Sequence, residues 1–472
     1  MPGIGSLSLP DTALLSNPLT DKFADDACLY FTRTGRWSVA SLTVTNCRLS
    51  FAESGFRIHV TNDLVIGANG EFGMGGDPAG TGYVLSCAGN VLLTNNGIMT
   101  VYSGLTNATT PSWGAEIRVT NGFTVSPGSW VYPVSHADNG GSPIFRMSNL
   151  YVRVNSGFSA STKGYGPRQG PGAAPNAGGA GGGAHGGKGG DGQTGAGGAA
   201  YGVTNAPVRP GSGGGDYPNP DRYDKAGAGG GTVRIEASGL IQVGGTLLAN
   251  GESGTYDVWG AGGAGGAIYL ACNSFAGDTN AVIQVNGGSS YGSNTVYTGG
   301  GGGGRIAVWQ GVSTADRNLH LSGENVENLS ISTLFPNYDG IISWTNGAGR
   351  TSNPAQPGTR RFMRIAAPNS SYLQIVGKPN NLHGTPQPLG YGSHLNITNG
   401  TIITNRVASP ADQVGGFRHA CTGWILKKDD GSFITSGVNT QAVFNLTNNM
   451  VLTWYWTNQY LLTVTASSNG TV

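Results

Sequence analysis

Charged side chains are scarce in this sequence. Asp, Glu, Lys and Arg together make up 11% of the 472 residues, whereas about 25% is usual in soluble proteins. The 26 basic residues nearly balance the 25 acidic ones, which leaves a net charge of +1. Because a nucleic-acid binder needs a basic surface, we expect no nucleic-acid partner. Hydrophobic residues make up 38% of the chain, which argues against charge-driven disorder.

Long apolar runs are also missing. No stretch reaches the roughly 20 apolar residues that cross a bilayer, so we expect no membrane insertion. The opening MPGIGSLSLP lacks the basic and apolar regions of a signal peptide, which predicts a removed leader or an excised piece. The last residues, 461–472, resemble the start of another strand-rich unit, so we expect a fragment of a longer protein.

Metal-binding and catalytic motifs are absent. The sequence contains no HExxH, no GxSxG before a helix and no phosphate-binding GxxxxGK[ST]. His185 lies among glycines and is expected to stack or cap rather than to bind a metal, so we predict no metal site.

The cysteines argue against zinc as well. They are odd in number and none is spaced as Cys-x-x-Cys. We expect them to be small buried hydrophobic residues, with a disulfide between the first two left open as an alternative. They are Cys28, Cys47, Cys87, Cys272 and Cys421.

Helix signals are almost absent, because no window of about 12 residues places apolar residues at i, i+3, i+4 and i+7. Short alternating runs closed by Gly, Asn or Pro are frequent instead, as in Phe56–Val60, Ala115–Val119 and Thr232–Ile235. Such runs are typical of β-strands, and the sequence predicts an all-β protein.

The strand runs recur at regular spacing. Gly231–Ile235, Gly266–Leu270 and Gly304–Val308 begin 35 and 38 residues apart, and Leu248–Gly251 returns as Gln284–Gly287. Self-similarity at periods of about 20–50 residues is the signature of a solenoid. We predict a right-handed parallel β-helix in which each coil contributes two or three strands with inward Ile, Val and Leu.

Glycine, with 83 copies in the chain, is concentrated in residues 164–231. A flexible linker is one interpretation of such a segment. Because glycines have no side chains to hold backbones apart, we favour ordered, left-handed, polyproline-like runs lying on the solenoid.

The composition changes near Met363, with fewer Gly and more Pro, Trp and Thr. The regularly spaced strands that follow are typical of a small antiparallel β-sandwich. We therefore predict an N-terminal arm or cap at 1–27, a β-helix at 28–345 with the Gly-rich insert 164–231, a linker at 346–362, and the sandwich at 363–472, whose end runs into a truncated next repeat.

Two groups of motifs resemble parts of known bacterial proteins. One group is similar to the Gly-rich β-helix segments of very large secreted or surface proteins of environmental bacteria, and the other to a β-rich module often found beside them. Together they cover roughly residues 160–470. The resemblance implies a secreted or cell-surface location and no assigned activity. The motifs are Lys163–Gly166, Gly170–Gly172, Gly182–Gly190, Pro210–Gly215 and Gly299–Ile306, then Gly384–Pro386, Cys421–Trp424 and Leu452–Trp456.

Three loops of successive coils carry aromatic side chains. Such loops project from one side of a solenoid, so their rings should line one groove. Sugar rings pack their C–H faces on aromatic rings, which predicts a groove for a polysaccharide or cell-surface glycan. The alternative is that the rings cap the solenoid and cover its Gly backbone. The predicted glycan-binding residues are Tyr217, Tyr223, Tyr256, Trp259, Tyr291 and Tyr297.

The charged residues of the same loops allow a catalytic alternative. Many polysaccharide lyases and glycoside hydrolases are β-helices, although fold alone does not imply activity. Hydrolysis needs two carboxylates about 5–9.5 Å apart. A lyase would need a basic residue beside a cation such as Ca²⁺, and otherwise we expect no cofactor. The catalytic candidates are Asp216, Asp221, Asp224, Arg222, Glu252 and Asp257.

The function that we favour is glycan binding or adhesion by a rigid extracellular rod, with a polysaccharide-degrading enzyme second. In an adhesin, binding could lie instead in exposed rings of the carboxyl module, namely Trp424, Trp454, Tyr455 and Trp456, with the alternative that Trp454 and Trp456 both face one core. A third alternative is a self-assembling filament or sheath, since uncapped β-helix ends template pairing between copies. Residues 25–31 are the predicted cap.

Overall fold

A computed structural model describes residues 5–21, 26–77, 79–106, 113–174, 180–193, 195–216, 226–255, 260–290, 297–312, 331–332, 337–351, 353–365, 370–414 and 416–460. Within these ranges the protein is all-β, and the short helical turn η1 (Thr12–Leu14) is of the 3-10 type. No helix in the described ranges is long and apolar enough to span a membrane.

Three long sheets make up most of the fold. The first contains β1 (Gly5–Leu9), β2 (Asp26–Phe31), β5 (Arg48–Phe51), β8 (Glu71–Met74), β11 (Ile98–Tyr102), β14 (Trp130–Val134), β17 (Gly157–Ser159), β20 (Thr246–Leu248), β23 (Val282–Gln284) and β27 (Ile341–Ser343). The second contains β4 (Leu42–Thr45), β7 (Leu64–Gly67), β10 (Val91–Leu93), β13 (Gly122–Val125), β16 (Asn149–Val152), β19 (Leu240–Val243), β22 (Ser274–Gly277) and β26 (Asn337–Tyr338). The third contains β3 (Arg36–Val39), β6 (Arg57–Val60), β9 (Tyr83–Cys87), β12 (Ala115–Val119), β15 (Pro143–Met147), β18 (Thr232–Ala237), β21 (Ala267–Ala271), β24 (Arg305–Gln310), β28 (Thr359–Ile365) and β25 (Ile331–Ser332).

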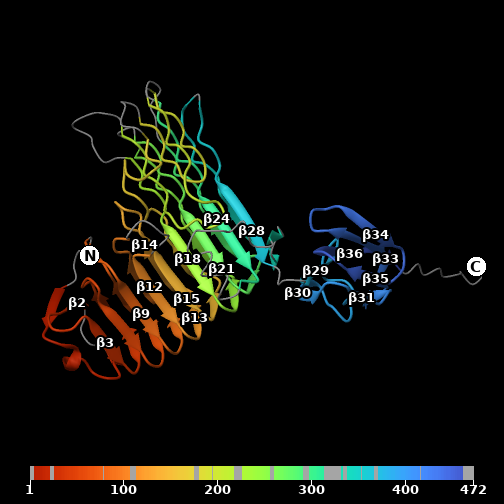
Figure 1. Cartoon of the computed structure of the whole chain (residues 1–472), viewed down its shortest axis with the longest axis horizontal. Coiled ribbons are helices and arrows are strands. Elements are labelled where there is room, and N and C mark those ends of the chain that lie inside the picture. The colour runs from red at the N-terminus through yellow and green to blue at the C-terminus, as the bar shows by residue number, and fades with distance from the viewer. Residues whose placement is uncertain are drawn as a thin grey trace, which may run out of the picture. The chain divides into compact units, whose positions relative to one another are not determined.

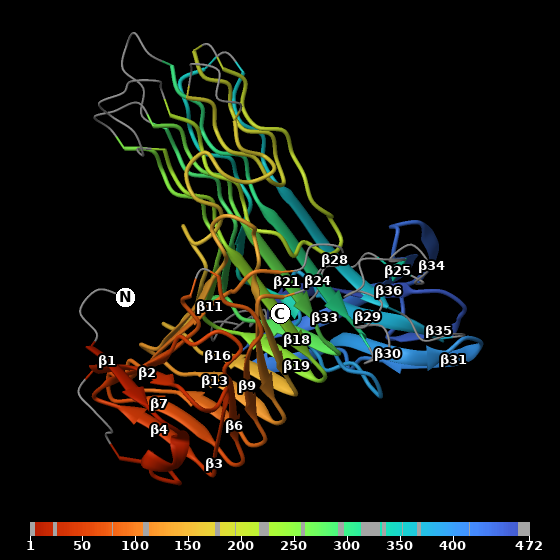
Figure 2. The same ribbon diagram turned by 60° about the vertical axis from the view of Figure 1, so that its left-hand side comes forward.

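The strands pass through these sheets in a fixed cycle. For example, β12 lies in the third sheet, β13 in the second and β14 in the first, and β15 then starts the next coil. Strands of consecutive coils pair in parallel in all three sheets. Figure 1 shows the coils stacked from β2 to β24, and Figure 2 shows β1 beside β2 at the first coil. The architecture is the parallel β-helix that the sequence predicts.

The strand register confirms the predicted repeat lengths. Ile235 lies opposite Leu270, which lies opposite Val308, so these coils are 35 and 38 residues long. Leu248 lies opposite Gln284, as the second repeated motif predicts. The sequence alignment of the coils is therefore also their spatial alignment.

Alternation along each strand sends apolar side chains inward, where they form one continuous core. Stacked rings fill the first coils. Phe31 and Phe56 lie 5.1 Å apart between ring centroids, and Phe51 and Phe56 lie 5.6 Å apart. Burying one such side chain contributes roughly 1.5–3 kcal/mol to stability. The coils are thus held together by side chains that the period-2 pattern already marks as inward.

The chain divides into two compact units, Met1–Asn328 with Tyr338–Phe362, and Leu329–Asn337 with Met363–Val472. The second unit contains a mixed sheet, in which β29 and β36 pair in parallel and the other described pairs are antiparallel. A two-stranded antiparallel sheet, β31 with β35, shares its apolar core. The strands are β29 (Ser370–Lys378), β30 (Gly392–Thr398), β31 (Thr401–Arg406), β32 (Ala411–Val414), β33 (Phe417–Lys428), β34 (Phe433–Gly437), β35 (Gln441–Leu446) and β36 (Met450–Tyr460).

The tryptophans of this module face its core. Trp454 is fully buried, and Trp424 and Trp456 are each only 7% exposed. These three indoles are therefore not exposed rings that a ligand could contact, whereas Tyr455, on the opposite face of β36, is half-buried. The competing expectation, that the alternating tryptophans share one core, is confirmed.

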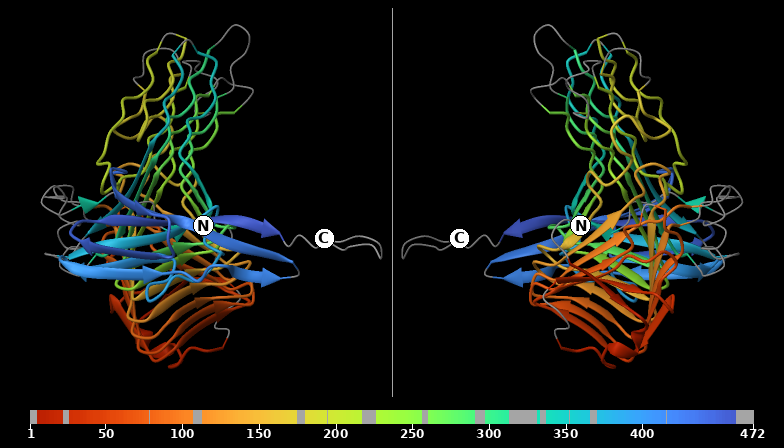
Figure 3. Two further views of the ribbon diagram at one scale, coloured as in Figure 1. Left: turned by 90° about the vertical axis from the view of Figure 1, so that its right-hand side faces the viewer. Right: turned by 90° about the vertical axis from the view of Figure 1, so that its left-hand side faces the viewer.

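Glycine-rich runs extend the later coils between the first and third sheets. We call them the glycine array, and Figure 3 shows them rising side by side from one side of the coils. The run 260–266 leads directly into β21, and 299–304 leads into β24. The array comprises residues 164–174, 180–193, 195–216, 226–231, 249–255, 260–266, 285–290, 297–304, 345–351 and 353–358.

Hydrogen bonds within the array repeat every three residues. The N–H groups of Gly262 and Gly265 donate to one neighbouring run, at Gly299 and Gly302, whereas that of Ala264 donates to another run. Three residues per turn is the period of a polyproline II helix. The described glycine runs are therefore hydrogen-bonded to one another with the period that a polyproline II helix has, and they pack on one another as well as on the coils.

Close packing explains the choice of glycine in the array. A Cβ added to Gly301 would overlap the carbonyl oxygen of Gly263, and one added to Gly182 would overlap that of Gly300. Neither glycine has a positive φ, so the reason is space between backbones and not backbone conformation.

Candidate functional site

The described stem of the first predicted loop is closed by a carboxylate. The backbone N–H of Ala226 donates to Asp216 Oδ1 over 2.6 Å, and Arg168 Nε lies 3.5 Å from Asp216 Oδ2. Asp216 therefore joins the two ends of its loop. The other candidates of this loop lie outside the described residues: Tyr217, Asp221, Arg222, Tyr223 and Asp224.

The stems of the three loops are neighbours. Ala261, beside the second loop, donates its N–H to the carbonyl of Gly215, beside the first, over 3.1 Å. Gly254 donates to Ser289, beside the third loop, over 2.9 Å. The glycine array thus brings together chain segments that belong to successive coils.

Two more predicted residues, Glu252 and Tyr297, are described, and both are exposed. Glu252 Oε2 accepts a hydrogen bond from the N–H of Ala228 over 3.0 Å, so this carboxylate also holds backbone. Tyr297 is 48% exposed at the base of the third loop, and its carbonyl accepts a hydrogen bond from Gln193. The remaining candidates lie outside the described ranges: Tyr256, Asp257, Trp259 and Tyr291.

In the described residues, no group of three His, Cys, Asp or Glu side chains is arranged to hold a metal ion. None of the five cysteines, all of which lie in the described ranges, forms a disulfide, so Cys28 and Cys47 are not joined. Burial raises the pKa of the Cys87 thiol, which keeps it protonated and unreactive.

His185 joins two runs of the glycine array, next to the point where one of them leads into β21. Its Nδ1 donates to the carbonyl oxygens of Gly265 and Gly266, at 3.1 and 3.0 Å, and its ring centroid lies 5.0 Å from that of Tyr201. The expectation of a stacking or capping residue is confirmed. Burial, followed by the charge of Arg305, lowers the pKa of His185 to about 3.

We expect His185 to make stability fall at acidic pH. An unfolded histidine binds a proton near pH 6.5, whereas the folded one does so only near pH 3, so its contribution is complete above pH 6.5 and declines below it. At pH 5 the loss should be about 2 kcal/mol. Urea unfolding between pH 7 and 5 should show this slope in the wild type and lack it in His185→Asn, whose amide preserves a donor. Equal slopes in both proteins would contradict the assignment.

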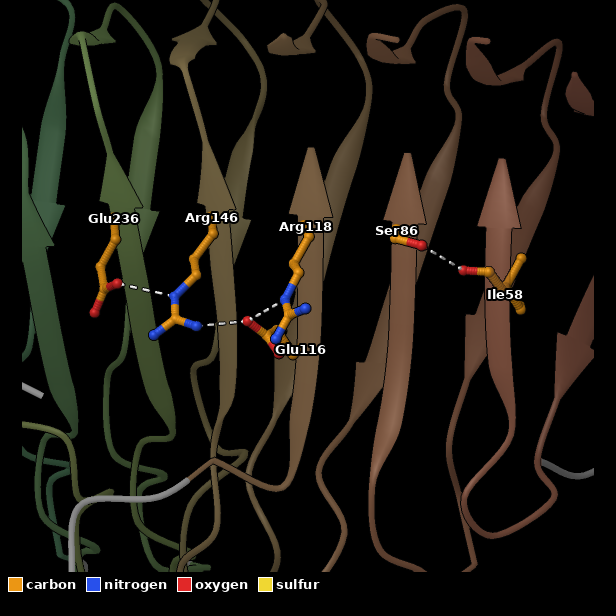
Figure 4. A network of polar contacts seen from close by, with 6 residues as sticks. All are labelled: Ile58, Ser86, Glu116, Arg118, Arg146 and Glu236. Carbon is orange, nitrogen blue, oxygen red and sulfur yellow. Dashed lines mark hydrogen bonds and ion pairs between the residues drawn. The ribbon is translucent and has the colours of Figure 1, made fainter. Parts of the chain in front are cut away.

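A chain of ion pairs crosses the outward face of the third sheet (Figure 4). Arg146 Nη1 lies 2.6 Å from Glu116 Oε1, and its Nε lies 3.0 Å from Glu236 Oε2. Arg118 Nε contacts the same Glu116 oxygen at 2.7 Å. The side chains of Glu116 and Glu236 are only 2% and 1% exposed, so both carboxylates are removed from water.

The outward face is covered on both sides of these ion pairs. The indole of Trp113 lies over the guanidinium of Arg146, 4.5 Å from ring centroid to Cζ. Farther along the sheet, Arg305 donates to the carbonyl of Tyr201, and Trp309 Nε1 donates to that of Asn205 over 2.7 Å. The segment 201–205 therefore lies over β24. The outward face of the third sheet is covered by protein here and is not exposed to solvent.

These ion pairs link coils at the place where the Gly-rich insert enters. Phe145 lies opposite Ile235, although 90 residues separate them in sequence. A guanidinium bound to carboxylates of both neighbouring strands fixes the register across this joint. In the described geometry both carboxylates serve as anchors for Arg146, and neither is placed as a free acid or base.

Sequence reasoning missed this network. Its only signal is the presence of charged residues at outward positions of three equivalent strands, as in Glu116, Arg146 and Glu236. Alternation predicts that such positions face outward, but it does not predict that a distant loop covers them.

Compared with known proteins, the chain matches no protein-family model, no curated protein and no solved structure.

Proposed function

We propose that this protein binds an extended glycan outside the cell, through the loops at the end of the glycine array, with the solenoid as a rigid support. The observation that carries the proposal is the convergence of three loop stems on an array of backbone hydrogen bonds. An array of this kind fixes the positions of the loop stems before a ligand binds, which reduces the entropic cost of association.

Composition and resemblance support the location. The chain is poor in charge and rich in Gly, and its motifs resemble those of very large secreted or surface proteins of environmental bacteria. Half-exposed Tyr297 offers a ring face beside polar backbone, which is the chemistry that sugars use. A neutral or weakly charged glycan is the ligand that so few charges favour, and binding should therefore depend little on salt.

Replacing one loop ring should weaken glycan binding about fivefold, since a single aromatic contact contributes about 1 kcal/mol. The variants are Tyr297→Ala and Trp259→Ala, tested by calorimetry with a ligand first identified on a polysaccharide panel. Tyr30→Ala is the matched control, because Tyr30 is 39% exposed on the first coils, away from the loops. Unchanged affinity in both loop variants would refute the proposal.

The same panel distinguishes the other functions. Release of reducing ends that is abolished by Asp221→Asn or Asp257→Asn would identify a polysaccharide-degrading enzyme. Sedimentation as long polymers without glycan binding would identify a filament or sheath subunit. Either result would replace adhesion as the function.

A further inference from the structure

The first sheet carries a pair of outward aromatic rings on β14. Alternation along this strand places Val131 in the core, where it is fully buried, and Trp130 and Tyr132 on the opposite face, where both are half-buried. The core of these coils is therefore complete without the two rings. Their position on the outer face requires a separate explanation.

The two rings are stacked on the outer face of the strand. Their planes lie within 15° of parallel, and their centroids are 6.4 Å apart. On the neighbouring strand the residue opposite Trp130 is Gly157, which has no side chain. A Cβ at Gly157 would lie only 3.0 Å from Trp130 Cζ3, so the indole leans across the place that a side chain would fill.

A cation lies over one of these two rings. Lys163 Nζ is 5.7 Å from the ring centroid of Tyr132. The backbone of Lys163 is fixed by two hydrogen bonds, one from its N–H to Ala160 and one from the N–H of Ser135 to its carbonyl. The nearby carboxylate of Glu71 is paired with Arg48 at 2.9 Å, so its charge is balanced locally, whereas Lys163 adds a positive charge beside the rings.

We infer that Trp130, Tyr132 and Lys163 form a second glycan-binding site, on the solenoid itself, for a sugar chain that carries carboxylates. Pyranose C–H faces pack on the two rings, and the ammonium group of Lys163 binds the carboxylate of a uronate residue beside them. The inference shares only its ligand class with the proposed function, because its residues lie on β14 and the adjoining corner and not in the loops.

A protein with two such sites would hold one polysaccharide at two points or crosslink two chains. The effective concentration at the second site then raises the overall affinity beyond that of either site. Selectivity differs between the sites, because the loop site favours a neutral or weakly charged glycan and the β14 site favours an acidic one.

Calorimetry with a galacturonate hexamer and a matched neutral glucose hexamer tests the inference on the whole chain. We expect Trp130→Ala and Tyr132→Ala each to weaken galacturonate binding about fivefold. Lys163→Gln should weaken galacturonate binding while leaving binding of the neutral hexamer unchanged. Tyr151→Ala, which removes an outward ring from β16, is the matched control and should change neither.

Two further variants keep failure of this site separate from failure of the loop site and from misfolding. Tyr297→Ala should leave galacturonate binding intact, and Trp130→Phe should keep both the fold and most of the affinity. Galacturonate affinity equal to wild type in Trp130→Ala, Tyr132→Ala and Lys163→Gln would overturn the inference. So would a loss of galacturonate binding confined to the loop variants.

Discussion

Arg146→Met is expected to lower the free energy of unfolding by about 3–5 kcal/mol. The arginine contacts Glu116 and Glu236 at once, and both carboxylates are almost fully buried. Methionine fills a similar volume but leaves two buried negative charges without their shared partner. Urea unfolding followed by circular dichroism measures the change, with fluorescence as a second probe of the transition.

Arg118→Met is the matched control for this result. Arg118 contacts the same Glu116 oxygen, but its side chain is 58% exposed, so its loss should cost less than about 1 kcal/mol. Adding Glu116→Gln and Glu236→Gln to Arg146→Met should recover part of the stability, because the two buried carboxylates that lose Arg146 are then replaced by neutral amides. A single variant Arg146→Met as stable as the wild type would mean that the ion pairs are not formed in solution.

Gly301→Ala should destabilise the glycine array by about 3 kcal/mol or more. The new methyl group would overlap the carbonyl oxygen of Gly263, and the obstacle is backbone that is itself hydrogen-bonded to neighbouring runs. The overlap can be relieved only if whole runs separate. The expected loss of stability is therefore at or above the upper end of the range for ordinary overpacking. Limited proteolysis measures it directly, since cutting at Arg168, Lys188 or Arg209 should become rapid.

Gly35→Ala provides the comparison, because a Cβ at Gly35 meets nothing within 4 Å. That variant should keep the unfolding midpoint and the proteolytic resistance of the wild type. If Gly301→Ala behaved in the same way, the runs would not be packed backbone to backbone.

The architecture could be predicted from the sequence because each coil of a solenoid repeats the same pattern of buried and exposed residues. Each coil buries the same positions against its neighbours, so Ile235, Leu270 and Val308 occur at equal places in the repeat and in the stack. The tryptophans of the second unit were harder to interpret. Alternation places Trp454 and Trp456 on one face of β36, but it does not predict whether that face is buried or exposed to solvent.

The loop site was predictable only in part. The repeat predicts that loops of successive coils project from one side, and the described stems at Gly215, Ala261 and Ser289 are linked by hydrogen bonds of the glycine array. Sequence could not assign Asp216 and Glu252 to backbone contacts, because their partners Ala226 and Ala228 are recognised only from the closed geometry of the stems.

By itself, the sequence determined the strands, the coil period and the need for glycine in the array, since all three depend on interactions that recur at fixed spacing. Tertiary structure alone decided which outward positions are covered. Arg146 meets Glu236 although 90 residues separate them in sequence, and Trp309 meets the carbonyl of Asn205. Each of these contacts occurs only once, so it produces no repeating pattern in the sequence. Only the folded arrangement of distant segments brings these charges and rings together.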